Sequence, residues 1–122
     1  MIKFIEMDAN VPMSAQMQEA GGPVILVNKF NVADADVERF LQIWSEDAAF
    51  MKRQPGFIST QLHRGIGGSG VFLNYAVWES VEAFRAAFSQ PEFQEALGKY
   101  PENIEASPHL FQKIAVPGIC TG

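Results

Sequence analysis

Cysteine and histidine are scarce in this sequence. The only cysteine among the 122 residues is Cys120, so an intrachain disulfide is excluded. The two histidines, His63 and His109, lie far apart, and neither has a second metal-ligating residue at a recognised spacing. We therefore expect no bound metal, and no disulfide framework of the kind that stabilises small secreted domains.

Long apolar runs and clustered cations are also missing. No apolar stretch approaches the roughly 18 residues that would span a bilayer, and no basic segment precedes an apolar one at the N-terminus. The chain carries 9 basic against 14 acidic residues, and Lys52-Arg53 is its only adjacent cationic pair. A phosphate backbone needs several clustered cations. We expect a soluble, cytoplasmic protein that binds neither membranes nor nucleic acid.

Aromatic residues, by contrast, are abundant. Ten Phe, two Trp and two Tyr accompany a hydrophobic fraction of 48%. The length suits one domain by the usual prior of about 100–200 residues. Because so small a domain buries only a modest share of its surface, some of these rings are expected to line an apolar pocket or a subunit interface.

Hydrophobic periodicity predicts alternating strands and helices after an N-terminal arm. We assign residues 1–22 to the arm and its linker, 23–116 to the domain and 117–122 to a tail. Alternation and β-branched content predict strands, and apolar spacings of three and four predict helices. The predicted order is strand 24–30, helix 37–51, strand 57–64, strand 71–78, helix 81–88, helix 90–100 and strand 108–116.

Local signals support these boundaries. In the longest helix the apolar stripe comprises Val37, Phe40, Leu41, Trp44, Ala48 and Met51. Ser80 is predicted to cap the following helix, and Ser89 to Glu92 fits a capping box with proline in the first turn. The glycine-rich stretch 65–70 leads from one strand into another, so it is interpreted as a hairpin turn rather than a phosphate cradle.

This order predicts an α+β, ferredoxin-like βαββαβ fold. Such a fold has a four-stranded antiparallel sheet with its helices on one face. The other face is then bare, and on either register it carries several apolar side chains, either Val71, Leu73, Tyr75 and Val77 or the alternate set. An apolar bare face predicts a partner sheet, and the simplest partner is a second copy in a homodimer.

Candidate site residues are polar groups inside apolar strands. Asn28 and Asn74 each interrupt such a strand, and Trp78 shares a strand face with Asn74. An amide beside an indole suits a flat phenolic ligand, whose oxygen the amide can hold. The alternative remains that Trp78 is core and that Asn74 bonds backbone. If the ligand hypothesis is right, we expect these residues to converge on one pocket with Phe40, Trp44 and Phe84.

The joins between elements resemble the antibiotic biosynthesis monooxygenase family. Met51-Lys52-Arg53-Gln54-Pro55-Gly56-Phe57 is similar to that family's helix–strand join, and Val77-Trp78-Glu79-Ser80-Val81-Glu82-Ala83-Phe84 to its strand–helix join. The resemblance covers about residues 23–116. It implies a ferredoxin-like fold whose subunits pair sheet to sheet as a dimeric α+β barrel.

The family contains different chemistries. One branch converts polyketide phenols to quinones without a cofactor and has an Asn and a Trp four residues apart on the third strand. Asn74 and Trp78 match this pair, whereas that branch's tyrosine position falls at about Phe84. Besides the heme-degrading branch considered next, this fold includes isomerases and small signal-processing proteins, and these motifs are compatible with that group too.

The heme-degrading branch fits less well. Asn28 matches its asparagine on the first strand, but its Trp and His positions fall at Ala87 and Leu97. Without an axial histidine no heme ligand is available. The resemblance therefore implies a protein that uses neither heme, flavin nor metal.

These observations predict a cofactor-independent monooxygenase that oxidises an electron-rich aromatic or polyketide-like phenol with O2. Asn74 is expected to hold the oxygen that ionises, and Trp78 to stack on or bond the substrate. His63 is the candidate base, because the unperturbed pKa of a histidine side chain is near 6.5. Asn28, Phe40, Trp44 and Phe84 are expected to bind substrate. The alternatives are a non-redox isomerase or lyase of the same fold, and a dimeric small-molecule-binding protein without turnover.

Overall fold

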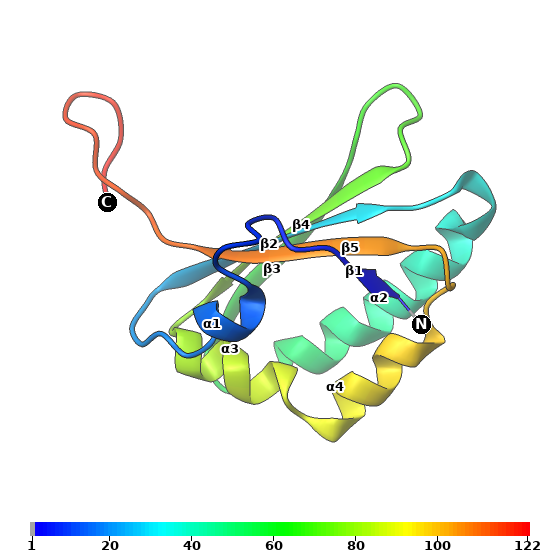
Figure 1. The fold of residues 1–122 in the computed structure, drawn as a ribbon, viewed down its shortest axis with the longest axis horizontal. Helices are drawn as coiled ribbons and strands as arrows, with labels where there is room; N and C mark the ends of the chain where they lie inside the picture. The colour runs from blue at the N-terminus through cyan, green and yellow to red at the C-terminus, as the bar shows by residue number, and fades with distance from the viewer. Residues whose placement is uncertain (1) are drawn as a thin grey trace.

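A computed structural model describes residues 2–122 as one sheet with helices packed on one face (Figure 1). The strands are β1 (Lys3–Phe4), β2 (Val24–Asn31), β3 (Phe57–Arg64), β4 (Val71–Trp78) and β5 (Glu105–Phe111). The helices are α1 (Met13–Gln16), α2 (Val37–Lys52), α3 (Val81–Phe88) and α4 (Pro91–Ala96), with single turns η1 (Asp34–Asp36) and η2 (Leu97–Lys99). No helix among residues 2–122 is both long and apolar enough to cross a membrane.

The sheet confirms the predicted α+β, ferredoxin-like topology. Its strand order is β1-β5-β2-β4-β3. The pairs β5-β2, β2-β4 and β4-β3 are all antiparallel. The strand predictions for 57–64 and 71–78 agree with β3 and β4, and the glycine-rich turn joins them. The fifth strand, β1, comes from the N-terminal arm and adds to β5 in parallel. The arm therefore lies against the sheet of its own chain.

Helix α2 buries a stripe that is rotated from the predicted one. Its buried residues are Phe40, Ile43, Asp47 and Phe50, whereas Leu41 is 40% exposed. These positions follow spacings of three and four, as a helix packed on a sheet requires. The prediction that Leu41 faces the core was wrong. The rotation moves Leu41 out of the buried stripe on one side and brings Ile43 into it on the other.

The helix cap predicted at Ser80 is present. The Ser80 hydroxyl accepts a hydrogen bond from the Ala83 N–H at 3.0 Å. The capping box at Ser89 was wrong: Ser89 has helical backbone angles, and its N–H donates to the Arg85 carbonyl in the last turn of α3. A residue that ends one helix cannot adopt the extended backbone of an N-cap. Gln90 takes that position, and Pro91 opens α4 as expected.

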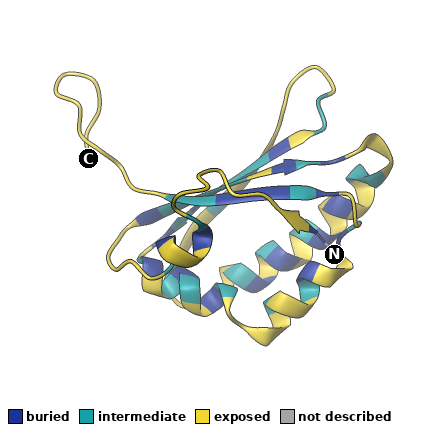
Figure 2. Cartoon of the chain, in the orientation of Figure 1, coloured by how far each residue is buried: buried dark blue, intermediate teal, exposed yellow. Residues whose placement is uncertain are grey.

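The last strand lies earlier than predicted. Strand β5 runs from Glu105 to Phe111 and includes the buried Pro108, which we expected to begin it. Because β1 pairs only with Glu105 and Ala106, β5 is an edge strand at Pro108, where a missing N–H is tolerated. Beyond β5 the chain leaves the sheet, and Val116 forms an isolated bridge with Cys120 in an exposed tail (Figure 2).

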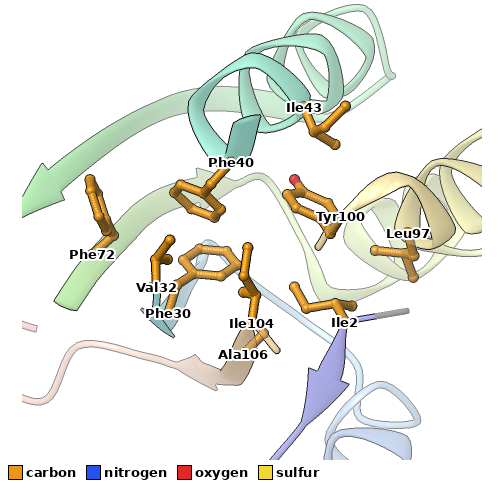
Figure 3. Close-up of a cluster of buried hydrophobic side chains, with 10 residues drawn as sticks. All are labelled: Ile2, Phe30, Val32, Phe40, Ile43, Phe72, Leu97, Tyr100, Ile104 and Ala106. Atoms are coloured by element: carbon orange, nitrogen blue, oxygen red, sulfur yellow. The ribbon is translucent and has the colours of Figure 1, made fainter. Parts of the chain in front are cut away.

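Two apolar clusters fill the space between the sheet and the helices. The first, drawn in Figure 3, centres on Phe40, whose ring is tilted against Phe30, Phe72 and Tyr100. The second centres on Trp78 and Phe84, both about 1% exposed. Residues of both clusters border one internal cavity.

Candidate active site

A cavity of about 80 Å³ lies between the sheet and the helices. Its walls are mainly aromatic and aliphatic, and, apart from two indoles, the polar side chains that line it are Asn28, Asp47, Thr60, Asn74 and Tyr100. Sites that bury drug-sized ligands typically measure about 300–1,000 Å³. A polycyclic ligand therefore requires part of the wall to move. Phe4 of β1 lines the cavity and is 43% exposed.

Two amides form the polar part of the sheet wall. Asn28 on β2 is paired in register with Asn74 on β4, so the two side chains lie next to each other on one face. The Thr60 hydroxyl donates a hydrogen bond to Asn74 Oδ1 at 2.5 Å. Because this bond occupies the amide oxygen, Asn74 presents its NH₂ group, a pure donor, to a ligand.

Asn28 offers a hydrogen-bond acceptor instead of a donor. Its Oδ1 atom is buried and has no hydrogen-bond partner within the described chain. An unsatisfied buried acceptor costs on the order of 1–3 kcal/mol. A ligand hydroxyl that donates to Asn28 Oδ1 would remove this cost. The sheet wall thus combines an unpaired acceptor with an adjacent donor.

Rigid aromatic side chains border the amides. The Trp78 ring meets Phe57 and Phe84 edge to face, with centroids 5.4 and 5.7 Å apart. Trp44, half-buried on α2, lines the cavity from the helix layer. Such walls suit a flat aromatic ligand and exclude water from it.

One carboxylate also borders the cavity. Asp47 is buried in the stripe of α2, and its Oδ2 accepts a hydrogen bond from the Tyr100 hydroxyl at 2.6 Å. Burial raises the pKa of Asp47 to about 6, although the Tyr100 hydrogen bond opposes this shift. Burial and the neighbouring Asp47 carboxylate raise the pKa of Tyr100 above its ordinary value.

The structure brings five of the seven candidate residues together. Asn28, Trp44, Asn74, Trp78 and Phe84 all line the cavity. Phe40 does not: it is fully buried in the adjoining cluster, enclosed by other rings (Figure 3). The expectation that Phe40 binds substrate is replaced by a packing role.

His63 also lies away from the cavity. The ladder between β3 and β4 has a register shift between Phe57 and Ser59. Because of this shift Phe57 and Thr60, an odd number of residues apart, both line the cavity. His63, which strict alternation would place on the face of Phe57, is exposed, and its Nδ1 lies 3.2 Å from the Leu73 carbonyl oxygen. It is not positioned to act as base on a ligand in this cavity.

Sequence reasoning missed Asp47, Thr60 and Tyr100. Asp47 carried a usable signal, because it follows Trp44 by three residues and precedes Met51 by four, and so stands inside the apolar stripe. Tyr100 ends an apolar spacing with Phe93, Ala96 and Leu97, which predicts packing rather than a role in a site. Thr60 gave no comparable signal, since threonine is also typical of surface strands. In the part of the chain that the structure describes, no three His, Cys, Asp or Glu side chains gather as a metal-ligand set.

Residues 23–99 match the family model described as antibiotic biosynthesis monooxygenase. A curated relative, deoxynogalonate monooxygenase of Streptomyces nogalater, is 40% identical over 70 residues, which cover 57% of this chain. The chain spans 58% of the length of that relative.

Solved structures share the fold. SnoaB, a cofactor-independent oxygenase of Streptomyces nogalater, is 33% identical with a TM-score of 0.69, over 78% of this chain and 96% of its own. A Shewanella loihica protein proposed to be a monooxygenase is 34% identical with a TM-score of 0.66, over 79% of this chain and 98% of its own. The match therefore covers nearly the whole of each of these two solved chains.

Proposed function

Because the chain belongs to the antibiotic biosynthesis monooxygenase family, to whose model residues 23–99 match, we propose that it is a cofactor-independent monooxygenase that oxidises an aromatic phenol with O2. The observation that carries this proposal is the pair of adjacent amides in an aromatic cavity, one with an unpaired buried acceptor. SnoaB, with the same fold, is a cofactor-independent oxygenase, which supports this chemistry.

The amide pair favours a particular arrangement of oxygens on the substrate. The Asn74 amide N–H groups favour an oxygen that bears negative charge, because charge-assisted hydrogen bonds are the stronger ones. The Asn28 Oδ1 atom favours a hydroxyl that stays protonated. A polycyclic phenol with two neighbouring oxygens, one ionised and one protonated, satisfies both amides at once.

The reaction needs no redox group beyond its two substrates. Loss of the phenol proton leaves an electron-rich phenolate, which donates one electron to O2. The resulting radical pair joins by a C–O bond at the ring carbon para to the phenolate oxygen and gives a peroxide. Loss of the ring C–H proton and cleavage of the O–O bond then release water. Overall a phenol with a free para position and O2 yield a quinone and water.

The protein's own contribution is to bind the substrate and to stabilise its anion. Asn74 holds the phenolate oxygen, and donors placed where charge develops are the largest single source of catalysis in many enzymes. Trp44 and Trp78 enclose the ring. The surrounding apolar walls admit O2, which is itself apolar, and keep water away from the peroxide.

Oxygen consumption tests the proposal. The purified protein, with no added flavin, heme or metal, is expected to consume O2 when given a dihydroxynaphthalene with a free position para to one hydroxyl. With isotopically labelled O2, one labelled oxygen atom is expected in the quinone and one in water. Isomerisation without O2 uptake would favour the lyase or isomerase alternative, and tight binding with no product would favour a binding protein.

We also propose that the chain forms a homodimer through the sheet face opposite the cavity. That face carries exposed apolar side chains, with Ile58 51%, Val71 37% and Tyr75 41% exposed. No helix of residues 2–122 covers it (Figure 1). Light scattering at micromolar concentration is expected to give twice the chain mass, and Tyr75→Glu is expected to shift this towards the monomer. A monomer in the unsubstituted protein would contradict the proposal.

A further inference from the structure

Only two titratable side chains line the cavity among the residues that the structure describes, Asp47 and Tyr100. Asp47 comes from α2, the layer opposite the sheet that supplies Asn28 and Asn74. A ligand between the two layers therefore has amides on one side and a carboxylate on the other. His63, the base expected from the sequence, lies on the outer face of the sheet and leaves that role unfilled.

The hydrogen bonding of Asp47 leaves one oxygen available. Oδ2 accepts the Tyr100 hydroxyl at 2.6 Å, and no other hydrogen bond to Asp47 is present over residues 2–122. The charged groups that act on it are Glu46, its neighbour on α2, and Lys99 of η2; neither forms an ion pair with it in the described chain. Asp47 is only 8% exposed.

A purely structural role for Asp47 explains less. A buried tie between α2 and the segment after α4 needs only a neutral acceptor for the Tyr100 hydroxyl, such as an asparagine. A buried carboxylate without a cationic partner is destabilising. Buried ionisable groups of this kind are common at functional sites. The raised pKa of Asp47, about 6, keeps it ionised at neutral pH yet basic enough to accept a proton.

We propose that Asp47 is the general base of the cavity and that Tyr100 is the residue that positions it. This inference rests on the proposed function and names its proton acceptor. The phenol O–H bond breaks, its proton passes to the free Oδ1 of Asp47, and its electron pair stays on the phenolate oxygen, which the Asn74 N–H groups hold. Nothing is oxidised in this step, and the products are a bound phenolate and a neutral carboxyl group.

Asp47→Asn is the direct test, because asparagine keeps the size and still accepts the Tyr100 hydrogen bond. We expect kcat to fall about 100-fold at neutral pH, within the range typical for loss of a general base. The pH profile is expected to lose its rise near pH 6 and to follow the ionisation of the phenol itself, so that alkaline pH restores much of the rate.

Tyr100→Phe tests the positioning role separately. The Tyr100 hydrogen bond lowers the pKa of Asp47, so its removal is expected to move the acid limb of the profile to higher pH. We expect kcat on the plateau to fall less than about tenfold, a smaller loss than that from removal of the base itself. Glu38→Gln removes an exposed charge from the same helix and is the matched control, with an unchanged profile expected.

Anaerobic binding separates this inference from the proposed function. A phenol whose anion is coloured, such as para-nitrophenol, is expected to bind the unsubstituted protein as the phenolate below its own pKa, and Asp47→Asn in the neutral form. If para-nitrophenol binds as the phenolate but the dihydroxynaphthalene causes no O2 uptake in air, Asp47 stays as base and the oxygenase is overturned. O2 uptake with equal phenolate formation in both proteins would overturn the role of Asp47. Matching circular dichroism spectra and unfolding midpoints exclude misfolding as the cause.

Discussion

Replacement of Asn74 by alanine is expected to slow oxygenation by about 10²–10³-fold, the usual loss when one oxyanion donor is removed. The amide faces the cavity from β4, with its oxygen occupied by Thr60, so its N–H groups are the donors available to a phenolate. Kcat measured from quinone formation at saturating substrate checks this expectation. KM is expected to change much less, because the interaction strengthens as the oxygen ionises.

Stability is expected to change little in the same variant. The substitution leaves the Thr60 hydroxyl without its partner, which costs about 1 kcal/mol in the free energy of unfolding. Asn31→Ala is the matched control, since Asn31 ends β2 and its amide reaches Glu105 outside the cavity. An Asn74→Ala protein that oxygenates phenols at the rate of the Asn31→Ala control would remove the support for this site.

The fold followed from the sequence more completely than the site did. Strand alternation, the Gly65–Gly70 turn and the Ser80 cap are local signals, and each one agreed with the architecture. The errors at β5 and at the Ser89 box arose where tertiary context decides. An edge position accommodates Pro108, and the last turn of α3 takes Ser89.

The candidate site was only partly predictable because strand faces depend on register. Asn28, Asn74 and Trp78 could be placed together by alternation alone, since β2 and β4 pair without interruption. His63 could not, because one register shift in β3 reverses the face of every later residue. The alternation of apolar and polar residues in the sequence does not indicate such a shift.

Asp47 and Phe40 show the same limit on a helix. Both lie on the buried stripe of α2, about two helical turns apart, yet one side chain meets the cavity and the other the core. Asp47 borders the cavity, whereas Phe40 is enclosed by Phe30, Phe72 and Tyr100. The apolar stripe predicts that a residue faces the sheet. It does not predict whether the side chain packs in the core or lines the cavity.

Truncation of Phe40 is consequently expected to affect mainly the free energy of unfolding, and truncation of Trp44 mainly the KM. Phe40→Ala removes a fully buried ring and is expected to lower the free energy of unfolding by about 3–5 kcal/mol, typical of Phe→Ala in a core. A domain of this kind has only about 5–15 kcal/mol in total. Phe40→Leu keeps more of the packing, and we expect it to stay folded with near-normal KM.

Trp44→Ala removes a half-buried ring that lines the cavity. Its cost in unfolding free energy is expected to be about half that of Phe40→Ala or less, since less apolar area is lost from the core. The KM for the phenol, in contrast, is expected to rise about tenfold, because lost ring contact weakens binding by roughly 1.4 kcal/mol. Urea unfolding and steady-state kinetics measure the two quantities. If Phe40→Leu raised KM more than Trp44→Ala at equal stability, Phe40 would be a binding residue after all, and the cavity would extend into the cluster that now encloses it.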